Sequence, residues 1–130
     1  MKRILLLLSA ALITAACGGS STSSTASTPA ATSAPTQTIS ITESEFKIDP
    51  PSLSLKAGTY SFAAQNTGKF PHDLHFVSQG TTTEIGSLGV MKAGESQTAK
   101  LTFKAGTYTY FCGVDGHRDR GMQGTLTVTS

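Results

Sequence analysis

The segment Tyr108-Thr-Tyr-Phe-Cys-Gly-Val-Asp-Gly-His-Arg-Asp-Arg-Gly-Met-Gln-Gly-Thr-Leu-Thr-Val128 contains one alternating run that enters a loop and another that leaves it. The loop carries Cys112, His117 and Met122. The two-residue period of a strand places the two tyrosines and Cys112 on one face, so the cysteine ends an inward-pointing row. Glycines within the loop permit backbone turns that let the three side chains converge on one point.

The side chains on this loop are typical ligands of a redox-active metal. They offer a soft thiolate, an imidazole and a thioether, and His72 supplies a second imidazole upstream. One thiolate, two imidazoles and a weak axial thioether suit copper cycling between Cu(I) and Cu(II). Zinc is the chief competitor, but its structural sites take four ligands from Cys and His, and a thioether is a poor substitute. The spacing therefore predicts one copper ion held by His72, Cys112, His117 and Met122.

Each of these residues alone has an ordinary structural explanation. A buried cysteine or methionine often serves as a small hydrophobe or as core packing. His72 is suited to begin a strand, and His117 is suited to a solvated loop. The coincidence of all four in one spacing favours the metal site.

The region from Gln37 to Ser130 alternates apolar and polar residues repeatedly, as half-buried strands do. Turn signals separate these runs, as at Asp49-Pro-Pro51, Lys56-Ala-Gly58, Asn66-Thr-Gly68, Lys92-Ala-Gly94 and Lys104-Ala-Gly106. The pattern predicts an all-β domain over 37–130, an antiparallel Greek-key β-sandwich or barrel of about seven to eight strands. Its 94 residues suffice for one hydrophobic core.

The beginning of the chain reads as an export signal. Met1-Lys-Arg is a positive segment, Ile4 to Ile13 is apolar, and Thr14-Ala-Ala-Cys17 is a small-residue processing site, so 1–16 is predicted to be a signal peptide. Ten mostly apolar residues are too few to span a bilayer. The Ala-Ala-Cys17 order resembles the bacterial lipobox, which implies lipid on Cys17. Thr14 departs from the Leu, Val or Ile usual there, and ordinary cleavage after Ala16 is the alternative.

After Cys17 comes a segment that cannot build a core. Gly18 to Thr36 consists almost entirely of Gly, Ser, Thr, Ala and Pro, so 17–36 is predicted to be a lipidated cysteine with a disordered tether. A glycosylated stalk is the alternative. If Cys17 is lipidated, Cys112 is an unpaired thiol in an oxidising compartment, and a metal would explain it. The expected location is outside the cytoplasm, with the protein held to a membrane by its lipid only.

Net charge excludes one class of partner. The whole chain carries ten basic and eight acidic residues, and removal of Lys2 and Arg3 with the signal peptide leaves eight of each. The remaining basic residues are scattered, apart from Arg118 and Arg120, and form no stripe with interleaved aromatics. Nucleic acid is therefore not an expected partner. The protein is expected to be a monomer.

Three segments together resemble the cupredoxins, particularly the plastocyanin and azurin group. They are Asn66-Thr-Gly-Lys-Phe-Pro-His-Asp-Leu-His-Phe76, Gly106-Thr-Tyr-Thr-Tyr-Phe-Cys112 and Met122-Gln-Gly-Thr-Leu-Thr-Val128. The Cys-x4-His-x4-Met spacing is longer than that of plastocyanin and is similar to that of rusticyanin and sulfocyanin. The resemblance implies that His72, Cys112 and His117 form a trigonal ligand set, that Met122 is the axial contact, and that electrons pass through His117 near the surface.

The residues around His72 refine this assignment. His72, Leu74 and Phe76 share one face of a strand and His75 lies on the other, so His75 is expected to be a partly exposed histidine outside the site. Asp73 stands where many family members have Asn, whose amide braces the ligand loop. An aspartate there is expected beside the ligands, where its charge tunes the copper or is neutralised by Arg118 or Arg120. An ordinary surface turn residue is the alternative.

The cupredoxin resemblance implies a type 1 (blue) copper protein, not an enzyme, that carries single electrons between redox partner proteins. The lipobox at Cys17 adds the expectation that this protein is tethered to a membrane. The alternative function is extracytoplasmic copper binding or chaperoning, which usually uses several exposed Met or His residues. Only Met91 and Met122 follow the signal peptide. A copper enzyme would need a further metal site, for which His75 is the only spare histidine, and a metal-free adhesion sandwich is the remaining alternative.

Overall fold

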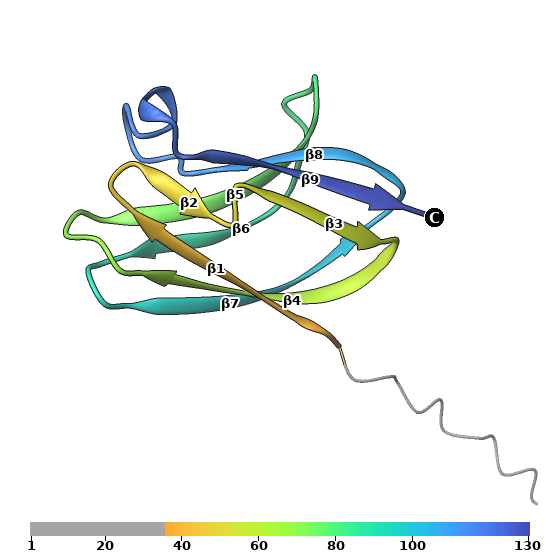
Figure 1. The fold of residues 1–130 in the computed structure, drawn as a ribbon, viewed down its shortest axis with the longest axis horizontal. Coiled ribbons are helices and arrows are strands. Elements are labelled where there is room, and N and C mark those ends of the chain that lie inside the picture. The colour runs from red at the N-terminus through yellow and green to blue at the C-terminus, as the bar shows by residue number, and fades with distance from the viewer. Residues whose placement is uncertain (1–35) are drawn as a thin grey trace, which may run out of the picture. The chain divides into compact units, whose positions relative to one another are not determined.

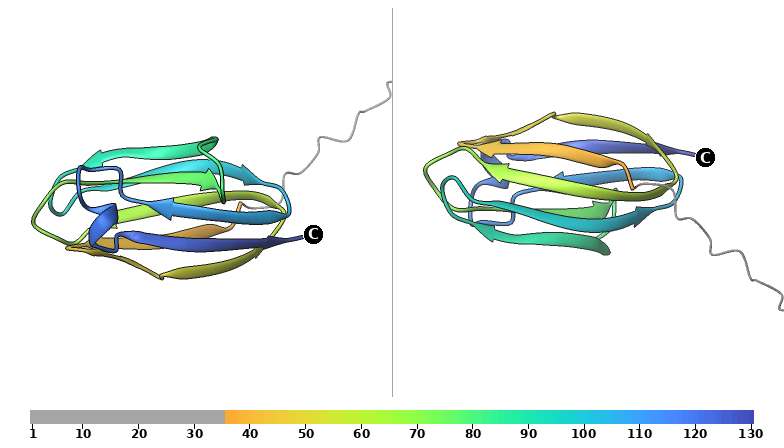
Figure 2. Two further views of the ribbon diagram at one scale, coloured as in Figure 1. Left: turned by 90° about the horizontal axis from the view of Figure 1, so that it is seen from above. Right: turned by 90° about the horizontal axis from the view of Figure 1, so that it is seen from below.

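The computed structural model describes residues 36–130, which form two face-to-face β-sheets (Figures 1 and 2). The first sheet has the order β2 (Lys47–Asp49), β1 (Thr38–Ser44), β4 (Gly58–Asn66), β7 (Ser96–Phe103). The second has the order β3 (Ser52–Lys56), β9 (Gln123–Thr129), β8 (Gly106–Phe111), β5 (His72–Ser78), β6 (Glu84–Met91). The helical content of the described residues is one 3₁₀ turn, η1 (Arg118–Arg120). The predicted β-sandwich is confirmed, whereas the predicted signal peptide and tether lie outside the described residues apart from Thr36.

The topology differs in detail from the expectation. The described residues hold nine strands, and the sheets are mixed, because β1 runs parallel to β4 and β3 runs parallel to β9. Across residues 36–130 the hydrogen bonding does not continue around a closed barrel, although the edge strands β6 and β7 lie against each other. Period-two alternation shows which face of a strand is buried but is the same for parallel and antiparallel pairing, so it does not reveal the direction of a partner.

The core lies between the sheets and is built from the inward positions of the alternating runs. Phe62, Phe76 and Phe103 pack with ring centroids 4.7 to 5.7 Å apart. Tyr110 joins them against Phe76 and directs its hydroxyl to the Pro50 carbonyl. Its ring covers Gly124 on the neighbouring strand, where any Cβ would overlap it. Glycine at position 124 therefore leaves room for the Tyr110 ring, the largest fully buried side chain among the described residues.

Strand register brings the predicted ligands to one end of the second sheet. β5 begins at His72, β8 ends just before Cys112, and β9 begins just after Met122. β5 and β8 are antiparallel neighbours, as are β8 and β9. Because antiparallel neighbours place the start of one strand beside the end of the next, these three positions lie together at one end of the sheet. Within the described part of the chain, no helix has the length and apolar character to cross a membrane.

One inward position of β1 carries a carboxyl group where the pattern calls for an apolar residue. Ile39, Ile41 and Glu43 alternate along the buried face, and the Glu43 side chain is fully buried. Neither carboxyl oxygen has a hydrogen-bond partner among the described residues. Burial first, and the negative charge of Asp73 second, raise the pKa of Glu43 from 4.5 to about 8. The folded protein therefore keeps this group protonated at neutral pH.

This raised pKa predicts a pH dependence of stability. Between pH 4.5 and 8 the native state holds a proton on Glu43 that the unfolded chain has lost, so stability falls as pH rises, by about 1.4 kcal/mol per pH unit from this group. Glu43→Gln should remove most of that slope. The measurement is denaturant unfolding of metal-free protein at several pH values in this window, with the exposed Glu95→Gln as control. An unaltered slope in Glu43→Gln would show that Glu43 is not buried as a neutral acid.

Candidate metal centre

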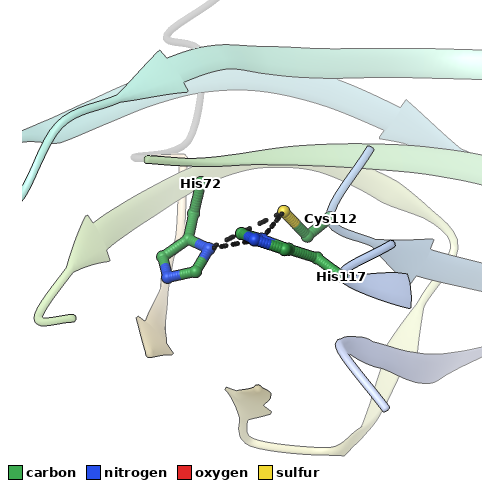
Figure 3. A group of neighbouring side chains, drawn as sticks. All are labelled: His72, Cys112 and His117. Carbon is green, nitrogen blue, oxygen red and sulfur yellow. Dashed lines mark hydrogen bonds between the residues drawn. The ribbon is translucent and has the colours of Figure 1, made fainter. Parts of the chain in front are cut away.

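Three donor atoms converge at the end of the second sheet (Figure 3). His72 Nδ1 lies 3.1 Å from His117 Nδ1 and 3.8 Å from Cys112 Sγ, and His117 Nδ1 lies 3.5 Å from the same sulfur. Metal–nitrogen and metal–sulfur bonds of about 2.0 to 2.3 Å would separate ligand atoms by about 3 to 4 Å in a trigonal arrangement. The spacing of these donors therefore fits a single ion.

Met122 lies next to two of the donors. The Cys112 N–H donates to the Met122 carbonyl over 3.0 Å, and the Met122 N–H donates to the His117 carbonyl over 3.2 Å. The Met122 side chain is fully buried. Its backbone bonds to Cys112 and His117 make Met122 the thioether available to complete the donor set of one sulfur, two imidazoles and an axial methionine that a type 1 copper site uses.

The ligand loop is shaped by short-range backbone bonds. The His117 N–H donates to the Val114 carbonyl over 3.0 Å, which forms a tight turn before η1. The turn ends at Gly121, whose φ of 106° lies in the left-handed region and whose N–H returns to the Arg118 carbonyl. Because glycine adopts this conformation without steric cost, the chain reverses there and delivers Met122 to the start of β9.

Burial sets the protonation of the donors. It raises the pKa of the Cys112 thiol to about 11, which keeps the thiol protonated and protects it from oxidation. Burial, followed by the neighbouring His117, lowers the pKa of His72, which keeps that ring neutral. A neutral imidazole is ready to bind a metal, whereas the thiol must release a proton as it does so.

Asp73 lies beside the donors without being one of them. One carboxyl oxygen accepts the Gly113 N–H, next to Cys112, and the other lies 3.2 Å from His75 Nε2. His75 Nδ1 lies 2.9 Å from Glu84, so this histidine is shared by two carboxylates and stays outside the donor cluster. Burial opposes protonation of His75, but the hydrogen bonds that His75 makes to Glu84 and then to Asp73 outweigh it and raise the His75 pKa.

The two loop arginines do not pair with Asp73. The Arg118 guanidinium lies 4.0 Å from the centre of the Phe111 ring, and that of Arg120 lies 4.6 Å from the centre of the Phe46 ring. Ion pairs to Asp73 among the described residues come from His75 alone. Of the alternatives for Asp73, neutralisation by an arginine has no supporting ion pair among the described residues, because cation–π contacts hold both arginines on aromatic faces.

The turn between β1 and β2 contributes two residues that sequence reasoning missed. The Phe46 ring packs edge-on against His117 with centroids 5.2 Å apart, and Glu45 Oε1 lies 3.5 Å from His72 Nε2. Hydrogen bonds from backbone N–H groups, that of Phe70 foremost, lower the pKa of Glu45 to about 2. The sequence does contain a sign of these inward carboxyl groups, because Glu43 and Glu45 continue the alternation of Ile39 and Ile41.

Comparison with known proteins agrees with this site. A family model described as a cupredoxin-like domain matches residues 7–128. Among the curated proteins, none matches this sequence.

Solved structures share the fold. Dithionite-reduced auracyanin from Roseiflexus castenholzii is 23% identical, with a TM-score of 0.68 over 73% of this chain and 98% of that one. Auracyanin A from Chloroflexus aurantiacus, described as a "blue" copper protein, is 25% identical, with a TM-score of 0.64 over 71% and 98% of the two chains. Rusticyanin from Thiobacillus ferrooxidans is 19% identical, with a TM-score of 0.61 over 72% and 78%. Since the family model spans nearly the whole chain, this protein belongs to the cupredoxin-like domain family.

Proposed function

We propose that this protein is a blue copper protein that carries single electrons between redox partner proteins. The observation that carries the proposal is the convergence of two imidazole nitrogens and one thiol sulfur, all buried, next to Met122. The similarity to a protein described as "blue" copper supports it, as does the similarity to an auracyanin studied in a reduced form.

The residues around the site suit electron transfer. Copper, when bound, supplies the one-electron couple. His72, Cys112 and Met122 lie at or next to the ends of β5, β8 and β9, so three of the four donors are held by strand ends, and His117 is held by the tight turn between them. Burial of all four side chains excludes water and bulky ligands, which disfavours both enzymatic chemistry and the hand-over of metal that a chaperone performs. His117, 9% exposed, is the donor nearest to solvent and the proposed route for the electron.

Copper loading tests this function directly. Addition of Cu(II) to the purified protein should give an intense blue thiolate-to-copper band at one ion per chain. Cys112→Ser should abolish that band because a hydroxyl cannot replace the thiolate, whereas His75→Ala should retain it because His75 lies outside the donor cluster. A colourless wild-type protein, or loss of the band in His75→Ala, would contradict the assignment.

The proposed location is the outer side of a membrane, with lipid on Cys17 as the anchor. The positive, apolar and Ala-Ala-Cys segments at the start of the chain support it. Cys17→Ser should release processed protein from the membrane fraction or leave it as precursor, as measured by fractionation and intact mass. Wild-type protein found wholly in the soluble fraction, with a terminus beyond Cys17, would contradict this anchor.

Asp73 is proposed to tune the copper. Its carboxylate accepts the N–H of Gly113, the residue after Cys112. A negative charge so close to the ligands stabilises Cu(II) over Cu(I). Asp73→Asn keeps an acceptor for Gly113 and removes the charge, so the reduction potential should rise. Voltammetry of the copper-loaded variant measures it, with the exposed loop variant Asp119→Asn as control. A potential equal to or below that of the wild type would show that the charge of Asp73 does not reach the metal.

A further inference from the structure

Glu45 lies on the far side of the His72 ring from the donor cluster. His72 directs Nδ1 to Cys112 and His117, which leaves Nε2 facing Glu45 Oε1 at 3.5 Å. This separation is long for a hydrogen bond and is an electrostatic contact. His72 is fully buried, and no described residue gives Nε2 a hydrogen bond of normal geometry.

The chemistry of a ligating histidine requires a group in this place. An imidazole that binds a metal through one nitrogen carries its proton on the other, and that N–H commonly donates to a carboxylate, a carbonyl or a water. Glu45 is the acceptor that the described residues offer to Nε2. A proton on Nε2 that faces this carboxylate would leave Nδ1 as the nitrogen that binds a metal.

The chain is built closely around the Glu45 carboxylate. Oε1 accepts the N–H groups of Lys69 and Phe70, the latter over 2.7 Å, on the loop that leads into His72. Gly68 lies so close that any Cβ there would overlap both carboxyl oxygens. The side chain is therefore held in one position by the segment that also carries the ligand, and its two N–H donors favour the ionised form.

We propose that Glu45 is a positioning residue of the copper site. Its carboxylate orients the His72 ring through Nε2, makes Nδ1 a stronger donor, and adds a negative charge that favours Cu(II) over Cu(I). This inference rests on the proposed copper function and assigns the turn between β1 and β2 a part in it.

Two variants and one control test the proposal on the copper-loaded protein. Glu45→Gln keeps the side-chain shape and removes the charge, so the equilibrium constant for reduction should rise about tenfold, which is about 59 mV for a one-electron couple. Gly68→Ala changes no charge but displaces the carboxylate, so the potential should shift in the same direction. Glu95→Gln removes an exposed charge from the turn after Met91, the residue paired with His72, and should shift it far less.

A second measurement reports on position. In the Cu(I) protein, nitrogen-15 NMR should show a His72 Nε2–H signal that exchanges slowly with solvent and exchanges faster in Gly68→Ala. If the wild type forms the blue band but Glu45→Gln and Gly68→Ala match the Glu95→Gln potential, the role of Glu45 is overturned while the copper function stands. If the wild type binds no copper, both proposals fail together.

Discussion

The backbone hydrogen bond from the Cys112 N–H to the Met122 carbonyl, 3.0 Å long, closes the ligand loop at its base. It continues the antiparallel ladder of β8 and β9 by one step beyond Phe111 and Gln123. The nine residues between its ends therefore form a loop with fixed ends, and the tight turn at His117 needs only to direct one imidazole inward. His72 reaches the same point because β5 pairs with β8 on its other edge.

The first sheet and the turn after β1 also contribute to the surroundings of the donor cluster. Inward positions of β1 and of the turn after it carry Glu43 and Glu45, two carboxyl groups with opposite environments. Glu43 has no hydrogen-bond partner among the residues that the structure describes and is held neutral by burial, whereas Glu45 receives two N–H donors and remains ionised. Burial of an uncompensated charge is costly, so the difference in hydrogen bonding decides which carboxyl group bears a charge beside the donors.

Aromatic contacts connect this turn to the ligand loop. Phe46 lies between His117 and the Arg120 guanidinium, and Phe111 lies between His75 and the Arg118 guanidinium. Both arginines thus cover rings beside the site instead of pairing with Asp73. Stacked guanidinium groups keep their charge exposed while their planar faces shield apolar surface. The result is a loop ordered by packing as well as by its backbone bonds.

Alternation and residue chemistry along the chain were enough to predict the strand faces and the candidate donors. Period-two alternation predicted that Tyr110 and Cys112 point inward with His72 on one face and His75 on the other, because side chains of a strand alternate whatever its neighbours are. It did not reveal that β1 and β3 have parallel partners, since alternation carries no direction. Nor did it reveal Glu45: its contact with His72 joins segments 27 positions apart in the printed sequence. Both this contact and the partner of Asp73 depend on which loops pack together, and packing between distant loops leaves no periodic pattern in the sequence.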